Sequence, residues 1–153
     1  MLTFDAAALA IILNAYEAMP TLKYPLEEYK CMAHAIYHES SNQSLDGMIA
    51  VGHVIRTRTY DARWPERVCA NINAAQFEYV SKGRTHLSPN NPIDENKIHV
   101  SFKLAVHILE GHLPDPTKGA DHFYNPGIAS PNWADSGYDR VSIEDHDFIK
   151  VDW

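Results

Sequence analysis

Cysteine is scarce in this sequence, which has only Cys31 and Cys69 among its 153 residues. Two thiols are too few for the disulfide framework of a small secreted scaffold or for a structural zinc site. Their spacing along the chain does not decide whether they pair. A reduced, cytosolic chain is the simpler interpretation and is our expectation, while the pairing of the two thiols stays open.

The sequence also lacks an excess of basic residues. It has 13 Lys and Arg against 20 Asp and Glu, which gives a formal net charge of −7 at pH 7. A negatively charged protein repels polyanions at long range. Nucleic acid is therefore excluded as the main partner.

Long apolar runs are missing as well. The run near the N-terminus, Ala6 to Leu13, follows Asp5 and has no basic residue before it, unlike a secretory signal. It is also shorter than the roughly 20 apolar residues that are needed to span a bilayer. We expect neither an export signal nor a membrane anchor.

The chain does contain enough apolar material for one hydrophobic core. Hydrophobic residues make up 45% of it, and no segment is repeated or compositionally biased. A length of 153 residues suits one compact domain and leaves no room for a second. We expect a single catalytic domain over residues 1–153, with a monomer as the working expectation.

Apolar residues recur at helical spacing in four segments. The expected helices cover about residues 4–19, 26–39, 45–58 and 95–110. Pro20 would end the first helix, Pro25 suits the start of the second, and Ser44 and Asp94 can cap the third and fourth. A further short helix is expected near residues 66–71.

Outside these helices the pattern is irregular. Residues 60–92 mix short apolar clusters with turn residues, and residues 114–153 are rich in proline and turn residues. Two short runs, 122–124 and 147–149, are compatible with strands. The expected fold is mainly α within the α+β class, with about four or five helices and a small irregular or β-containing C-terminal tail.

Glu39 has the wrong polarity for its position. It ends the second expected helix on the same stripe as the apolar residues Met32, Ala35 and Ile36. Partial burial and the negative end of the helix dipole both raise the pKa of a carboxyl group. A carboxylic acid that keeps its proton near neutral pH can protonate a leaving oxygen, as glycosidases require. The alternative is a surface residue at a frayed helix end, and the pattern alone does not separate the two.

Several short blocks occur in an order that resembles the SleB-type cell wall hydrolases, known from spore-cortex-lytic enzymes and phage endolysins. The blocks are residues 35–39, residues 47–58, Trp64-Pro65 with Val68-Cys69, Gln76-Phe77, residues 119–126, Pro131 with Trp133, and His146 with Phe148. Blocks in the right order at compatible spacing are much more specific than any one of them. The resemblance covers about residues 32–148. Thr57 and Glu144 depart from it, since asparagine and glycine usually stand there.

The resemblance implies a lysozyme-like enzyme that cuts the β-1,4 bond between N-acetylmuramic acid and N-acetylglucosamine in bacterial peptidoglycan. Glu39 aligns with the catalytic glutamate, which acts first as acid and then as base, and neither a metal nor another cofactor is implied. Lytic transglycosylation needs only this carboxyl group. Hydrolysis by a muramidase would use a second carboxylate, for which Asp46 and Glu78 are available. Neither lies in a block marked as catalytic, so transglycosylation is favoured, with hydrolysis close behind.

Polar and aromatic residues of the same blocks are candidates for binding the sugar. They are Gln76, His122, Tyr124, Asn125, Trp133 and His146. Saccharide sites combine oriented polar groups with aromatic walls. Structural roles remain as alternatives, because Asn-Pro initiates turns, tryptophan can seal a core and histidine often forms structural hydrogen bonds. Arg58 is expected to be an internal salt-bridge partner.

Two other functions remain open. His34 and His38 lie four apart beside Glu39, which suggests a zinc-dependent amidase or peptidase, although their order matches neither common zinc motif. A non-catalytic wall-binding module is the second alternative. The negative net charge counts mildly against any wall enzyme, since bacterial walls are often anionic. Without an export signal, we expect a phage or prophage enzyme that stays in the host cytoplasm until a membrane lesion releases it to the wall.

Overall fold

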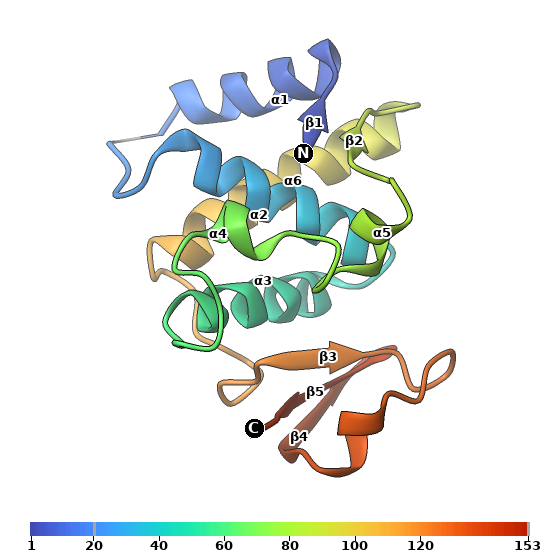
Figure 1. Ribbon diagram of the computed structural model, residues 1–153. Coiled ribbons are helices and arrows are strands. Elements are labelled where there is room, and N and C mark those ends of the chain that lie inside the picture. The colour runs from blue at the N-terminus through green and yellow to red at the C-terminus, as the bar shows by residue number, and fades with distance from the viewer. Residues whose placement is uncertain (20, 153) are drawn as a thin grey trace.

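The computed structural model describes residues 1–19 and 21–152, and helices dominate this part of the chain (Figure 1). The helices are α1 (Ala6–Glu17), α2 (Leu26–Ser40), α3 (Leu45–Thr59), α4 (Val68–Asn71), α5 (Glu78–Ser81), α6 (Pro92–Leu109) and the 3-10 helix η1 (Asn132–Asp135). The strands are β1 (Thr3–Phe4), β2 (His86–Leu87), β3 (His122–Tyr124), β4 (Tyr138–Ile143) and β5 (His146–Lys150). The prediction of a mainly helical fold with a small β-containing tail is confirmed.

Side-chain caps set the starts of α3 and α6. Ser44 accepts the backbone N–H of Gly47 at 3.4 Å, so the predicted cap of α3 is confirmed. The predicted cap at Asp94 is wrong. Asn91 caps α6 instead, accepting the Asp94 N–H at 2.9 Å, because Pro92 suits the first turn and starts the helix three residues earlier.

The short elements between α3 and α6 were not fully predictable. The expected helix near residues 66–71 exists as α4, whereas α5 and the parallel β1–β2 pair were missed. Elements of two to four residues are too short to display a hydrophobic period. The helix expected over residues 4–19 is shorter, as α1, and the stop predicted at Pro20 lies outside the described residues.

Helix α2 lies at the centre of the helical part and contacts α3, α4 and α6 (Figure 1). Met32, Ala35 and Ile36, the predicted apolar stripe of α2, are completely buried. At Gly52 of α3, an added Cβ would overlap Cδ1 of Ile108 and lie 3.1 Å from Cδ1 of Ile36, so the glycine lets these side chains of α6 and α2 pack directly against the α3 backbone. The C-terminal end of α2 is therefore held in place by packing on several sides.

The C-terminal segment forms an antiparallel sheet in the order β3-β5-β4, which lies next to α3 (Figure 1). Phe148 of β5 is completely buried and stacks on Phe123 of β3 at 5.8 Å between ring centroids. The strands predicted at residues 122–124 and 147–149 are confirmed. Strand β4 was not predicted, since a register irregularity between Tyr138 and Val141 interrupts its alternation.

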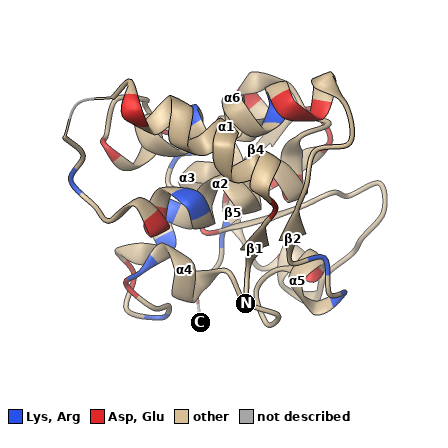
Figure 2. Cartoon of the chain, turned by 90° about the horizontal axis from the view of Figure 1, so that it is seen from above, with Lys and Arg blue, Asp and Glu red and all other residues tan. Residues whose placement is uncertain are grey.

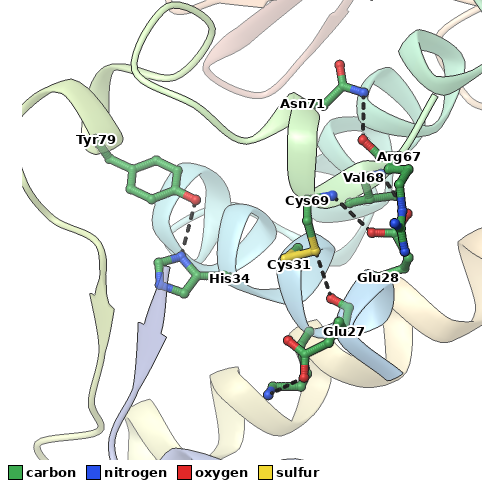
Figure 3. The surroundings of a disulfide bond; sticks show 10 residues. Glu27, Glu28, Cys31, His34, Arg67, Val68, Cys69, Asn71 and Tyr79 are labelled. Atoms are coloured by element: carbon green, nitrogen blue, oxygen red, sulfur yellow. Dashed lines mark hydrogen bonds and ion pairs between the residues drawn. A yellow bond between two sulfur atoms is a disulfide. The ribbon is translucent and has the colours of Figure 1, made fainter. Parts of the chain in front are cut away.

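Cys31 and Cys69 form a disulfide that joins α2 to α4 (Figure 3). The expectation of a reduced chain is therefore wrong for this structure. The Glu28 carboxylate of α2 also accepts the backbone N–H groups of Val68 and Cys69 at 2.9 and 3.1 Å. These connections fix α4, and with it the chain that leads to Gln76, against α2.

Acidic and basic positions are interspersed along the ribbon in Figure 2, and α6 carries residues of both signs. Several ion pairs are local, such as Lys30 with Glu27 and Lys82 with Glu78. Within residues 1–19 and 21–152, none of the helices combines the length and the hydrophobicity that crossing a bilayer requires.

Candidate active site

The structure brings all seven predicted catalytic and sugar-binding residues to one cleft of about 420 Å³. The cleft lies where the C-terminal end of α2, the chain around α5 and the β3–β5 sheet meet. Its lining includes Glu39, Gln76, His122, Tyr124, Asn125, Trp133 and His146, together with Arg58, Phe77 and Glu78. Side chains that are up to 107 positions apart in the sequence thus face a common space.

Glu39 projects from the last turn of α2 and is half-buried. No hydrogen bond or ion pair holds its carboxyl group within residues 1–19 and 21–152. Burial raises its pKa from 4.5 to about 7, and the negative charge of Glu78 acts in the same direction, whereas the positive charge of Arg58 opposes both. The protonated form of Glu39, which is the state that a general acid needs, is therefore accessible near neutral pH.

Arg58 supplies a buried positive charge at the same cleft. Its Nε donates to the carbonyl oxygen of Asp121 at 2.9 Å, and its guanidinium lies over the rings of Trp64 and Phe77 at 5.2 and 5.7 Å. Burial lowers its pKa to about 10, so it stays charged at neutral pH. Within residues 1–19 and 21–152 Arg58 forms no ion pair, so the predicted salt bridge is not found there, and a carbonyl group and aromatic faces hold the side chain instead. Its charge is left to act on Glu39.

Glu78 is a second carboxylate in the cleft. It is exposed and paired with Lys82 at 2.6 Å, and the hydrogen bond and charge of Lys82 lower its pKa. The environments of Glu39 and Glu78 thus move their pKa values in opposite directions, which is the pattern of a general acid beside an ionised carboxylate. Asp46, the other candidate, is exposed at the start of α3 and does not line the cleft.

Aromatic rings form one wall of the cleft. The Trp133 ring lies 4.7 Å from that of His122 and meets that of Tyr124 almost at a right angle, at 5.4 Å. Trp64 is buried and donates from Nε1 to Oε1 of Gln76 at 3.1 Å, so it fixes the amide that the sequence indicated. This positioning role of Trp64 was not predicted, although its aromatic-proline block was noted.

The two histidines of the cleft differ in their partners. Nδ1 of His122 bonds to the Asp121 carboxylate at 2.8 Å, and the same carboxylate accepts from Arg63 and from the Val151 N–H. His146 is buried, which lowers its pKa, and its Nδ1 has no hydrogen-bond partner within the described residues. The structural role that was left open thus applies most directly to His122.

Asn125 forms the turn that its Asn-Pro sequence indicates. Its Oδ1 accepts the N–H of Gly127 at 2.8 Å, and its backbone oxygen accepts the N–H groups of Ile128 and Ala129. The side chain nevertheless lines the cleft, so the turn presents its amide group to that space.

The rings of His34 and His38 are both stacked against that of Tyr79 (Figure 3 shows His34 and Tyr79). Nε2 of His34 lies 2.9 Å from the carbonyl oxygen of Thr85, and its Nδ1 lies 3.2 Å from the Tyr79 hydroxyl. Because a carbonyl only accepts, Nε2 carries the proton and Nδ1 accepts from Tyr79. Burial lowers the pKa of His34 to about 4. Both ring nitrogens of His34 are therefore occupied by hydrogen bonds. The described residues contain no group of three or more potential metal ligands.

Comparisons with known proteins identify the family of the chain. The family model described as Cell Wall Hydrolase matches residues 42–149, which begin three residues after Glu39. The spore cortex-lytic enzyme of Bacillus cereus is 29% identical over 128 residues, covering 83% of this chain and 46% of the relative. That of Bacillus subtilis is 24% identical over 107 residues, covering 69% of this chain and 32% of the relative. The chain thus spans less than half the length of these curated relatives.

Solved structures extend the similarity to three dimensions. The catalytic domain of the germination-specific lytic transglycosylase SleB from Bacillus anthracis superposes with a TM-score of 0.63 at 26% identity, covering 86% of this chain and all of that domain. The catalytic domain of the Bacillus cereus SleB protein gives the same TM-score and identity and is covered to 95%. The family model alone matches well over half of the chain. The chain therefore belongs to the cell wall hydrolase family.

Proposed function

We propose that this chain is a peptidoglycan lytic transglycosylase that cleaves the β-1,4 bond between N-acetylmuramic acid and N-acetylglucosamine, with Glu39 as its general acid and base. One observation carries the proposal. Among the described residues, no hydrogen bond or ion pair holds the Glu39 carboxyl group in the cleft, and burial raises its pKa to about 7. The similarity to SleB catalytic domains supports the reaction class.

The reaction needs one carboxyl group and no water. Protonated Glu39 donates its proton to the bridging oxygen, and the bond between that oxygen and the anomeric carbon breaks. The C6 hydroxyl of the muramic sugar attacks the anomeric carbon and closes a 1,6-anhydro ring. The Glu39 carboxylate takes the proton that this hydroxyl loses, which restores the starting state. Between the two transfers, the buried charge of Arg58 favours the carboxylate form.

Hydrolysis is the second candidate, and Glu78 is the observation that favours it. An ionised carboxylate in the same cleft suits either the activation of a water molecule or the stabilisation of an oxocarbenium-like transition state. Water would then take the place of the C6 hydroxyl, and the product would end in a reducing muramic acid.

Mass spectrometry of digested peptidoglycan tests these proposals. The unaltered chain should release muropeptides that are lighter by one water than the hydrolysis products, and Glu39→Gln should release none while keeping its fold. Products heavier by one water that also disappear in Glu78→Gln would establish hydrolysis. Cleavage of peptide or amide bonds, or wall binding without any cleavage, would rule out the glycosidase assignment. Activity lost on chelation and restored by zinc would support the amidase alternative.

For the setting, we propose a phage endolysin that gains access to the wall after release from the host cytoplasm. The Cys31–Cys69 disulfide supports action outside the cytosol, because disulfides persist in oxidising surroundings. Thiol labelling with a maleimide should modify both cysteines in intact host cells and neither after release. A disulfide already formed in intact cells would contradict this setting.

A further inference from the structure

Arg140 contacts the cleft wall from outside. It does not line the cleft, and no sequence block of the family resemblance contains it. Its Nη1 donates to the hydroxyl oxygen of Tyr124 at 2.8 Å and to Oδ2 of Asp147 at 2.9 Å, and its Nη2 donates to the carbonyl oxygen of Ala134 at 2.6 Å. One guanidinium therefore joins Tyr124 to the turn that carries Trp133, the two aromatic residues of the wall.

The sheet builds this contact. Tyr124, Asp147 and Ser142 lie opposite one another across β3, β5 and β4, so their side chains share one row on the same face. The Ser142 hydroxyl donates to Oδ1 of Asp147 at 2.6 Å, which leaves Oδ2 for Arg140. The register of β4 shifts just before this row, and Asp139 adopts a left-handed φ of 54° there. Such bulges redirect the next side chain, and here that side chain is Arg140.

The chemistry of the contact fixes the role of the Tyr124 hydroxyl. A guanidinium has only donors, so the phenol oxygen must accept from Arg140. The single hydroxyl proton of Tyr124 then remains for another acceptor. Because Tyr124 lines the cleft, this proton is available to a group of a bound substrate. A charged donor on the oxygen also strengthens the hydroxyl as a donor.

We propose that Arg140 is a positioning residue that commits the Tyr124 hydroxyl to donate a hydrogen bond into the cleft, and thereby selects sugars that carry an acetamido carbonyl. This specificity rests on the proposed action on N-acetylated glycan strands. An amide carbonyl oxygen is a stronger acceptor than the plain hydroxyl that other β-1,4-linked sugars carry at the same carbon. Asp147 accepts a hydrogen bond from Arg140 and holds it in place, so Asp147 contributes to sugar selection only through Arg140.

Binding of two trisaccharides tests the proposal without any dependence on catalysis. The probes are the β-1,4-linked trimers of N-acetylglucosamine and of glucose, titrated calorimetrically into the Glu39→Gln chain so that no bond is cleaved. This chain should prefer the acetylated trimer. Arg140→Met and Tyr124→Phe should each weaken its binding about tenfold, while leaving binding of the glucose trimer unchanged.

A double-mutant cycle separates positioning from mere stability. Arg140→Met with Tyr124→Phe together should cost no more than Tyr124→Phe alone, since Arg140 acts only through the hydroxyl group that Tyr124→Phe removes. Arg140→Lys should restore part of the affinity, because an ammonium group keeps one donor but loses the fork to Asp147 and Ala134. Arg67→Met, at an exposed arginine outside the cleft, is the matched control and should bind like the parent.

Several outcomes would overturn the proposal. They are equal affinity of the parent for the two trimers, unchanged binding by Arg140→Met, equal loss of both trimers, or additive losses in the cycle. If Arg140→Met does not fold, the cycle is run with Arg140→Lys, whose smaller loss of affinity for the acetylated trimer should vanish in the Tyr124→Phe background; a loss that persists there would overturn the proposal. Selective binding by a chain that leaves peptidoglycan uncut would instead contradict the proposed function and leave this specificity standing.

Discussion

The buried environment of Glu39 raises the pKa of its carboxyl group, which favours acid catalysis, and it also lowers the stability of the fold. The ordinary pKa of 4.5 applies to the unfolded chain and a pKa of about 7 to the folded chain. Between these two pH values the folded chain therefore binds a proton at Glu39 that the unfolded chain has lost. Stability therefore falls as pH rises from about 4.5 to about 7, and the penalty is complete above pH 7. A difference of this size corresponds to roughly 3 kcal/mol, at about 1.4 kcal/mol for each pH unit.

Glu39→Gln should accordingly stabilise the fold in alkaline solution. At pH 8 we expect its free energy of unfolding to exceed that of the unaltered chain by up to about 3 kcal/mol, because the amide carries no charge to desolvate. At pH 4 both proteins are neutral at this position, and the difference should vanish. Urea unfolding followed by circular dichroism at the two pH values measures it. A pH-independent difference would show that the carboxyl group is not desolvated.

The alkaline limit of activity should follow the ionisation of Glu39. We expect kcat/KM on soluble glycan strands to fall as pH rises through about 7, since only the protonated acid donates. Glu78→Gln should move this limit to lower pH, because it removes a negative charge that raises the pKa of Glu39. Glu66→Gln, outside the cleft, serves as the control and should leave the profile in place. An unmoved limit in Glu78→Gln would mean that the two carboxyl groups do not interact.

Glu144 shows how one residue can depart from a family pattern. Its φ is 50°, in the left-handed region where glycine is unstrained, which explains why glycine is usual at this hairpin turn. Its carboxylate accepts the backbone N–H of Ser44 at 3.0 Å, at the start of α3. The side chain thus ties the β4–β5 turn to a helix of the core, which a glycine does not.

At the scale of elements, the disulfide and Glu28 together attach α4 to α2 (Figure 3). The bond closes a loop of 38 residues that contains α3. In the chain-entropy model, such a loop contributes about 4 kcal/mol by restricting the unfolded chain. The same attachment places the segment with Trp64 and Gln76 beside the end of α2, so stability and cleft geometry share one support.

Removal of the disulfide should therefore weaken the fold and the enzyme together. Replacement of both Cys31 and Cys69 by serine should lower the free energy of unfolding by about 2–4 kcal/mol. Urea unfolding and wall clearing, each with and without a reducing agent, measure the effects. The unaltered chain should respond to reduction and the double variant should not. Equal stability of the two proteins under oxidising conditions would show that the bond contributes nothing.

For the whole molecule, the net charge of −7 opposes approach to an anionic wall. The clearing rate of purified walls should rise as salt increases from about 10 to about 150 mM, because the screening length shortens from about 30 to about 8 Å. Cleavage of short, soluble glycan strands, which carry far fewer negative charges than a wall, is the control and should change less. A clearing rate that falls with added salt would instead indicate local positive charges that bind the wall.

The long helices and the polar residue at the end of α2 were predictable, because helical periodicity, caps and proline positions are local signals. Residue blocks also indicated the seven site candidates, whose roles in substrate binding stay predictions. The single domain, the monomer and the release from the host likewise remain expectations. The start of α6 was misplaced because Asn91 and Asp94, three positions apart, are both suitable N-caps. Only the backbone conformation shows that Asn91 is the residue that caps the helix.

The sequence by itself determined where the four long helices lie, that Glu39 shares a helix face with apolar residues, and which blocks carry the family resemblance. Only the tertiary structure decided that Cys31 meets Cys69, that Glu78 and not Asp46 shares the cleft, and that Arg140 holds Tyr124. These pairings join residues far apart in the chain, or depend on a bulge in β4. Periodicity within one element has no information about them, because they depend on how separate elements pack.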